Sequence, residues 1–369
     1  MSESINGSPS SRRNRSMFIV DGHLDLAWNA LELGRDLVLP PAEVRAGEAA
    51  RGVNTRVGTC TVTLPALRAG GVDLVFATLF VEPARESSPG LSATVYHTAE
   101  EAHRFAAAQL EFYQRLVRTV PNTMLIRTRA DLATLRAPAP GDEAPLGLVL
   151  LMEGADPIRE PAEVGWWVEQ GVRLIGPAWS GTRYAGGTYK EGPLTPLGAE
   201  LLRAMEPYRV VLDTSHLAER AFWDALDVYA SPVIASHSNP RAFVPGVRQL
   251  SDEQIRAIVV RDGIVGTVFY NAFLDPTWKE HREKHRVTLA DAARAVDHVC
   301  QLAGDARHAA IGSDLDGGLG REACPAEVDS VADIGRLAEP LAALGYRAEE
   351  IAAILGGNWL RLLEKTLPP

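Results

Sequence analysis

The stretch Met17-Phe18-Ile19-Val20-Asp21-Gly22-His23-Leu24-Asp25 joins an apolar run, typical of a buried β-strand, to an imidazole and a carboxylate two residues apart. Alternate residues of a strand point to the same face of a sheet. His23 and Asp25 can therefore close on one cation. Three later apolar runs end in the same kind of group, namely Glu153, His216 and His237. One carboxylate pair and three histidines are enough donors for two metal ions.

Short apolar runs alternate along the chain with longer amphipathic runs. Eight runs have the length and composition of strands: 17–22, 72–81, 146–152, 172–177, 209–213, 232–236, 263–269 and 308–313. The intervening helical patterns cover 99–117, 161–170, 196–206, 218–229, 252–261, 289–303 and 331–344. Strands that alternate with helices predict parallel pairing and a sheet covered on both faces.

Eight such strands predict a closed (β/α)8 TIM barrel. The alternative is an open doubly wound sheet, but no Gly-x-Gly-x-x-Gly pattern follows the first strand to favour it. In a barrel the carboxyl ends of the strands meet at one mouth. We expect a disordered N-terminal tail over 1–16 and a single barrel domain over 17–369, in which the Pro-rich stretch 137–141 is a loop.

Composition and charge indicate an ordinary globular protein, with 46% hydrophobic and 23% charged residues. The formal net charge of -10 argues against nucleic acid and anionic membranes, which call for a concentrated basic face. No run approaches the roughly 18 apolar residues of a membrane span. The leader lacks the apolar core of a secretory signal, and the three cysteines are scattered, so we expect a cytoplasmic protein without a nucleic-acid or membrane partner.

The prediction of a metal site rests on several ligand-type residues that occur together at strand ends. A lone histidine at a strand end is more often a hydrogen-bonded structural group, and a glutamate after an apolar run can simply be solvated. Five ligand-type residues at four strand ends favour metal, because burying ionisable groups together without a cation is costly.

Three aspartates have expected roles beside these ligands. Asp314 closes the last predicted strand, where a carboxylate would face the metals as a general base. Asp316, two residues further into a Gly-rich loop, is the competing candidate, with a turn role as its alternative. Asp213 belongs to the fifth predicted strand beside His216, and we interpret it as a hydrogen-bonding partner of a ligand imidazole.

Seven short motifs span nearly all of the chain beyond the leader: Asp21-Gly22-His23-Leu24-Asp25, Met152-Glu153-Gly154, Leu194-Thr195-Pro196-Leu197-Gly198, Asp213-Thr214-Ser215-His216, Ser236-His237-Ser238-Asn239, Gly312-Ser313-Asp314-Leu315-Asp316-Gly317 and Gly357-Asn358-Trp359. With these motifs in this order, the chain resembles the membrane dipeptidase (renal dipeptidase, peptidase M19) family of the amidohydrolase superfamily. The resemblance implies a binuclear zinc site. In that site His23 and Asp25 hold one ion, His216 and His237 hold the other, and Glu153 bridges them. It also implies that Asp314 handles the proton of a metal-bridging water.

Three more residues are expected at the substrate. Arg248 stands at the family's spacing after the second histidine, where an arginine contacts the substrate carboxylate or the developing oxyanion; a surface arginine is the alternative. Tyr270 is expected to line the same pocket. The chain departs from the family at Trp179, where members usually carry a histidine that helps to polarise the scissile carbonyl. An indole can stack or donate one N–H but cannot become cationic, so hydrolysis of ordinary L-dipeptides is expected to be slow.

The leading hypothesis is a metal-dependent hydrolase that cleaves the amide of a dipeptide or an N-acyl amino acid. Two divalent ions are expected, and the nitrogen and oxygen donors favour Zn²⁺, with manganese, cobalt and iron as alternatives. A second hypothesis is an enzyme with the same barrel and metals that hydrolyses a lactone, a carbamate or another small amide. A third is a non-catalytic metal- or ligand-binding relative, which Trp179 favours and the presence of Asp314 opposes. The sequence is also compatible with a homodimer, and segments 180–191 and 273–286 are expected to shape the pocket.

Overall fold

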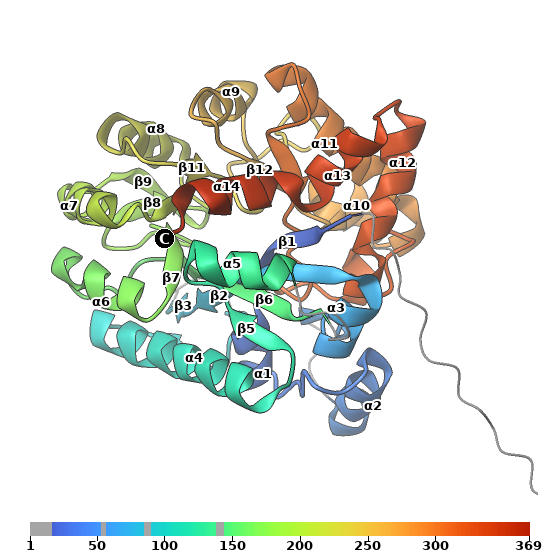
Figure 1. The fold of residues 1–369 in the computed structure, drawn as a ribbon, viewed down its shortest axis with the longest axis horizontal. Coiled ribbons are helices and arrows are strands. Elements are labelled where there is room, and N and C mark those ends of the chain that lie inside the picture. The colour runs from blue at the N-terminus through green and yellow to red at the C-terminus, as the bar shows by residue number, and fades with distance from the viewer. Residues whose placement is uncertain (1–16, 53–56, 85–89, 138–143) are drawn as a thin grey trace, which may run out of the picture.

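A curled parallel sheet forms the centre of the computed structural model, which describes residues 17–52, 57–84, 90–137 and 144–369 (Figure 1). The sheet runs in the order β1 (Ile19–Leu24), β2 (Val72–Phe80), β6 (Leu146–Glu153), β7 (Val172–Gly176), β10 (Val211–Asp213) and β11 (Val233–Ile234), and β5 (Thr123–Leu125) also pairs with β6. A bridge from Ala235 to Val265 leads to β12 (Val265–Thr267), which pairs in parallel with β13 (Ala309–Ile311). The expected tail over 1–16 and most of the Pro-rich loop lie outside the described residues.

The end of β13 returns to β1 through side-chain hydrogen bonds. The Ser313 backbone N–H donates to Asp21 Oδ1 over 2.8 Å, and the Ser313 hydroxyl donates to Asp21 Oδ2. The strands that overlap the eight predicted runs thus follow chain order around the sheet. This is the TIM-barrel-like α/β fold that the alternation of strands and helices predicts.

The outer helices follow the predicted amphipathic runs. They are α4 (Ala99–Thr119), α6 (Val164–Glu169), α7 (Pro196–Met205), α8 (Glu219–Val228), α9 (Asp252–Val260), α11 (Leu289–Ala303) and α12 (Ala338–Ala343). Two of the predicted runs begin differently, with the 3₁₀ turns η2 (Pro161–Glu163) and η7 (Val331–Leu337). Within 331–344 the reason is local, because Pro340 has no N–H to continue an α-helical ladder back to Arg336.

Several shorter elements fill the connections. Helices are α1 (Leu26–Glu32), α2 (Pro41–Arg51), α3 (Leu64–Gly70), α5 (Arg129–Arg136), α10 (Trp278–His281), α13 (Ala348–Ala352) and α14 (Asn358–Thr366); the strand pairs are β3 (Glu82–Pro83) with β4 (Val95–Tyr96) and β8 (Ala185–Gly187) with β9 (Lys190–Leu194). Over the described ranges, no helix combines the length and the apolar character that a membrane crossing requires.

One end of the barrel is closed by the C-terminal helix α14, which lies across the strands in Figure 1. Trp359 of α14 packs with inward-facing residues such as Val149 and Leu151 of β6, and its indole N–H donates to the Ile311 carbonyl over 2.8 Å. Gly22 makes room for this ring, since a Cβ there would lie 2.7 Å from Trp359 Cζ2. Because side chains alternate along a strand, Glu153 continues the inner face of Val149 and Leu151 toward the open, carboxyl end.

Candidate metal centre

Six ionisable side chains come together at the carboxyl end of the barrel. They are His23 in β1, Asp25 just after it, Glu153 at the end of β6, and His216, His237 and Asp314 after β10, β11 and β13. The ligand atoms within each of two overlapping groups, His23–Asp25–Glu153 and Glu153–His216–His237, lie within 4.8 Å of one another. The structure therefore brings all five metal-ligand candidates of the sequence into one cluster, with Glu153 common to both groups.

The two carboxylate oxygens of Glu153 face different imidazoles. Oε2 lies 3.5 Å from His23 Nε2, whereas Oε1 lies 3.1 Å from His216 Nε2 and 3.4 Å from His237 Nε2. Asp25 is on the first side, with its Oδ1 3.9 Å from His23 Nε2, and the Thr78 hydroxyl donates to that same oxygen. A carboxylate that presents one oxygen to each side has the shape needed to bridge two cations.

The imidazole nitrogens of His216 and His237 are arranged to bind a cation. The Nε2 atoms of His216 and His237 lie 3.0 Å apart. Their Nδ1 atoms contact the Thr188 hydroxyl at 2.9 Å and the Ser236 hydroxyl at 2.8 Å, respectively. Burial lowers the pKa of His216 to about 4 and the pKa of His237 well below its usual value. When both rings are neutral and carry their proton on Nδ1, two Nε2 lone pairs face the same space, which suits a cation.

His23 supplies a further test of fit. Its Nε2 atom is buried and has no hydrogen-bond partner in the part of the chain that the structure describes. A buried nitrogen without a partner is costly, and coordination to a metal would satisfy it. Imidazole and carboxylate donors without thiolate are also a ligand set that zinc accepts.

The charges of the cluster call for additional positive charge. Burial alone would raise the pKa of Glu153, but the charge of His23 and the nearby His216 and His237 rings hold that pKa well below its usual value. Burial also opposes a charge on His23, yet the carboxylates of Glu153, Asp25 and Asp314 raise its pKa to about 10. Burial and the Glu153 charge raise the pKa of Asp25 to about 6. Divalent cations would supply the countercharge that these carboxylates lack.

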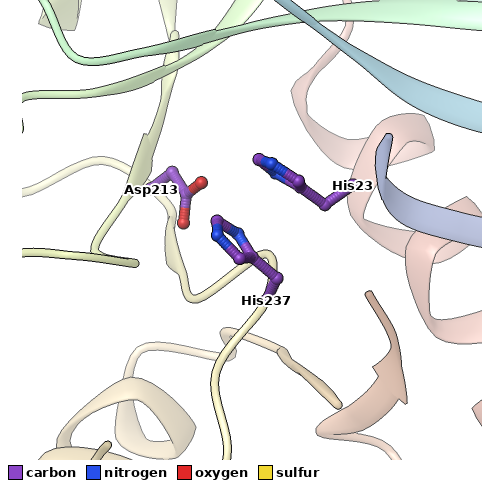
Figure 2. A group of neighbouring side chains, drawn as sticks. All are labelled: His23, Asp213 and His237. Atoms are coloured by element: carbon purple, nitrogen blue, oxygen red, sulfur yellow. The ribbon is translucent and has the colours of Figure 1, made fainter. Parts of the chain in front are cut away.

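Asp213 lies close to His23 and His237, and the ligand atoms of these three residues are within 4.8 Å of one another (Figure 2). Its Oδ1 accepts backbone N–H groups of Ser215 at 3.1 Å and Ser236 at 2.9 Å, and its Oδ2 accepts the Ser236 hydroxyl at 2.5 Å. That hydroxyl also contacts His237 Nδ1. The sequence indicated a partner for a ligand imidazole, and the structure links Asp213 through the Ser236 hydroxyl to His237, with His23 close by. Thr188 occupies the corresponding position at His216.

The structure gives Asp314 and Asp316 different surroundings. Asp314 lines the cavity at the cluster, and burial raises its pKa well above the usual value. Asp316 instead accepts the backbone N–H groups of Thr61 and Val62 and lies 3.2 Å from Arg35 Nη1. Asp316 therefore holds the distant loop at Thr61 and Val62, whereas Asp314 is the carboxylate that lines the cavity at the candidate metal centre.

The backbone at two of these positions is strained. His216 has a φ of 68° and Asp314 a φ of 58°, both in the left-handed region that side chains with a Cβ rarely adopt. Strain of this kind persists where the surrounding structure holds it, and it concentrates at functional sites.

A cavity of about 220 Å³ opens over the cluster. Its wall includes seven candidates from the sequence: Asp25, Glu153, His216, Asp314, Arg248, Trp179 and Tyr270. The Arg248 guanidinium is anchored to Ser238 Oγ at 2.9 Å and to the His237 carbonyl at 2.6 Å. Among the described residues, these two hydrogen bonds leave other N–H groups of the guanidinium free to bind a ligand in the cavity that Arg248 lines.

Sequence reasoning missed the residues that orient this cluster. Asp21, Thr78 and Thr188 hold Ser313, Asp25 and His216 as described above. The segments 180–191 and 273–286, expected to shape the pocket, do contribute Tyr189 and Phe273 to the cavity wall. Asp21 had a visible signal, since it is a carboxylate inside an apolar strand. The two threonines had none, because their partners lie on other strands and loops.

The fold and the chain have known relatives. The family model for membrane dipeptidase (peptidase family M19) matches residues 11–367. A Klebsiella pneumoniae protein from the pqqA 5′ region, itself uncharacterised, is 32% identical over 261 residues, which are 68% of this chain and 92% of that protein. Dipeptidase tcpJ of Claviceps purpurea is 28% identical over 314 residues, 82% of this chain and 69% of the relative.

Solved structures of the same kind cover almost the whole chain. The crystal structure of dipeptidase AC, a metallo peptidase of family M19, has a TM-score of 0.77 with 25% identity, covering 96% of this chain and 99% of that one. A Rhodobacter sphaeroides metallo peptidase, liganded with a phosphinate mimic of L-Ala-D-Ala, has a TM-score of 0.76 with 24% identity, covering 95% and 99%. The second likeness supports the fold alone.

Proposed function

Because the chain belongs to the membrane dipeptidase family, peptidase family M19, we propose that it hydrolyses the amide bond of a dipeptide or an N-acyl amino acid with two bound zinc ions. The observation that carries the proposal is the position of Glu153 between His23 on one side and His216 with His237 on the other. In the proposal His23 and Asp25 hold one ion, the other two histidines hold the second, and Glu153 bridges them.

When bound, two such ions would lower the pKa of a shared water and polarise the scissile carbonyl. Asp314 is proposed to accept the proton of the attacking water and to return it to the leaving amine. The position of Asp314 on the cavity wall, beside the candidate ligands Asp25, Glu153 and His216, supports this role.

Arg248 is proposed to bind the substrate carboxylate, because it lines the cavity and its guanidinium has N–H groups that the described residues do not use. Two rigid contacts, to Ser238 and to the His237 carbonyl, hold its guanidinium in place. Trp179 and Tyr270 complete the wall beside it. Together these residues orient a small molecule with a free carboxylate. We also propose that residues 17–369 act as one domain, and that the protein works in the cytoplasm, where its free cysteines stay reduced.

A second candidate function is hydrolysis of a different bond, that of a lactone or a carbamate, at the same candidate metal centre. The Trp179 ring lies beside the His216 ring, with 6.1 Å between centroids, in the position where the family resemblance leads one to expect a histidine. Without that imidazole, a more activated carbonyl such as that of a lactone or a carbamate would need less electrophilic help. This observation favours such substrates as the alternative.

Metal analysis combined with a substrate panel tests the proposal. Purified protein should contain about two divalent ions per chain, and it should hydrolyse members of a panel of dipeptides and N-acyl amino acids of mixed chirality. Chelation should abolish hydrolysis, and zinc should restore it. The Glu153→Ala, His216→Ala double variant should lose metal, whereas His285→Ala, which removes an exposed histidine, should not. Full metal content in the double variant, or hydrolysis that is indifferent to chelation, would contradict the assignment.

A further inference from the structure

Four aromatic side chains form a continuous row on the wall of the cavity. Ring centroids are 6.1 Å apart for Trp28 and Phe80, 5.0 Å for Phe80 and Trp179, and 5.0 Å for Trp179 and Tyr189. All four residues line the cavity over the candidate metal centre. These separations lie within the range at which aromatic rings interact favourably. We call these four residues the aromatic row.

The aromatic row is held rigidly by contacts outside the cavity. The indole N–H of Trp28 donates to Ser92 Oγ over 2.8 Å, and the backbone N–H of Phe80 donates to Gln109 Oε1 over 2.9 Å. A binding wall that is already ordered loses little conformational entropy when a ligand arrives.

Tyr189 is positioned by the hairpin β8–β9. The backbone N–H of its neighbour Thr188 donates to the Trp179 carbonyl over 3.0 Å. The Thr188 hydroxyl contacts His216 Nδ1 at 2.9 Å. One residue thus ties the hairpin both to the aromatic row and to the metal cluster. Because of these two contacts, Tyr189 has a defined place at the edge of the cavity.

Exposure increases along the aromatic row. Phe80 is 3% exposed and Trp179 6% exposed, whereas Tyr189 is 58% exposed. The row therefore leads from the interior to the cavity mouth and ends in a large ring open to solvent. A flat apolar group that enters along the row would cover the apolar surface of Tyr189 that now faces water, which is favourable.

Charged groups on the cavity wall are separate from the aromatic row. The acids Asp25, Glu153 and Asp314 belong to the candidate metal centre, and Arg248 is the one cation among the described residues that line the cavity. A polar group placed against the ring faces would lose water and gain little there, because the faces of aromatic rings are apolar. The wall thus offers a carboxylate site at Arg248 and an apolar site along the row.

We propose that the aromatic row binds the acyl side of the substrate, and that the preferred substrates are amino acids acylated with a flat, apolar group such as an aromatic acid. The inference rests on the proposed function for the orientation of the substrate, with its carboxylate at Arg248 and its amide at the metal cluster. Tyr189 is the specificity-determining residue at the outer end of the row.

Paired substrates that differ only in the acyl group test this. The N-benzoyl and N-acetyl derivatives of one amino acid, in both D and L forms, are compared with the zinc-loaded protein. The benzoyl compound should be favoured about tenfold or more in kcat/KM. Tyr189→Ala should lower that ratio about threefold to tenfold, chiefly through KM, and Tyr189→Phe should keep it, since the ring and not the hydroxyl is needed. Tyr208→Ala removes an exposed tyrosine that does not line the cavity and should leave the ratio unchanged.

Equal kcat/KM for the two acyl groups, or equal losses on both in Tyr189→Ala, would overturn the inference while leaving the hydrolase proposal standing. Calorimetry on the Asp314→Asn variant measures binding of the N-benzoyl and N-acetyl compounds without turnover. It therefore tests the aromatic row separately from the hydrolase proposal. Tighter binding of the benzoyl compound that Tyr189→Ala abolishes supports the aromatic row even if neither compound is hydrolysed. Indistinguishable binding of the two compounds overturns it.

Discussion

Gly317→Ala is expected to displace the Asp314 carboxylate without removing it. A Cβ on Gly317 would lie 1.9 Å from Asp314 Oδ1, 2.8 Å from Asp314 Cγ and 3.0 Å from the Asp314 carbonyl oxygen. Ordinary contacts between such atoms begin near 3.4 Å, so the carboxylate oxygen must retreat by about 1.5 Å. Rotation of the carboxylate alone does not relieve the contact with the backbone oxygen, and the whole residue must shift.

The size of the effect follows from that displacement. A misplacement of about 1 Å at a reacting group can cost about a hundredfold in rate, so kcat should fall by at least about that factor. Overpacking of this kind should also destabilise the protein by about 1–3 kcal/mol. Bound metal should stay near the wild-type level, because Asp314 is proposed as a proton carrier and not as a ligand.

The assay measures kcat, metal content and thermal stability on the same preparations. Gly47→Ala is the matched control, since it lies in α2 and its new Cβ would meet only Arg51 Nη1 at 3.9 Å; it should leave kcat unchanged and add stability if anything. A folded, metal-loaded Gly317→Ala protein whose kcat stays within about threefold of wild type would refute the placement of Asp314 in the proton transfer.

Two further substitutions probe the substrate side of the cavity. Arg248→Met should weaken substrates with a free carboxylate by roughly 1.5–3 kcal/mol more than their amidated analogues, as kcat/KM on matched pairs would show; equal losses on both would remove Arg248 from the carboxylate site. Trp179→His should raise dipeptide hydrolysis relative to ester hydrolysis, because an imidazole can help polarise the carbonyl where an indole cannot. Wild-type kcat/KM of about 10⁴ M⁻¹s⁻¹ or above on common L-dipeptides would argue against that reasoning.

The sequence alone was sufficient to predict the barrel and to predict which residues meet at the carboxyl ends of its strands. Apolar runs such as 146–152 are local, and their alternation with amphipathic runs predicts parallel strands in chain order, which the structure confirms. Glu153 could be placed at a strand end for the same reason. In a parallel barrel all strand ends of one kind meet at one mouth, so residues from distant segments could be expected together before their contacts were known.

Contacts across the barrel depend on how the strands close, and only the tertiary structure decided them. Asp213 illustrates this: the sequence indicated a partner for a ligand imidazole, but only the structure shows that its contact with the Ser236 hydroxyl leads to His237. Asp21 pairs with Ser313, 292 positions away, and the alignment of Tyr189 with Trp179 depends on a hairpin that the sequence did not predict. Local pattern determines which face a side chain takes, whereas strand register and loop packing determine which partner it meets.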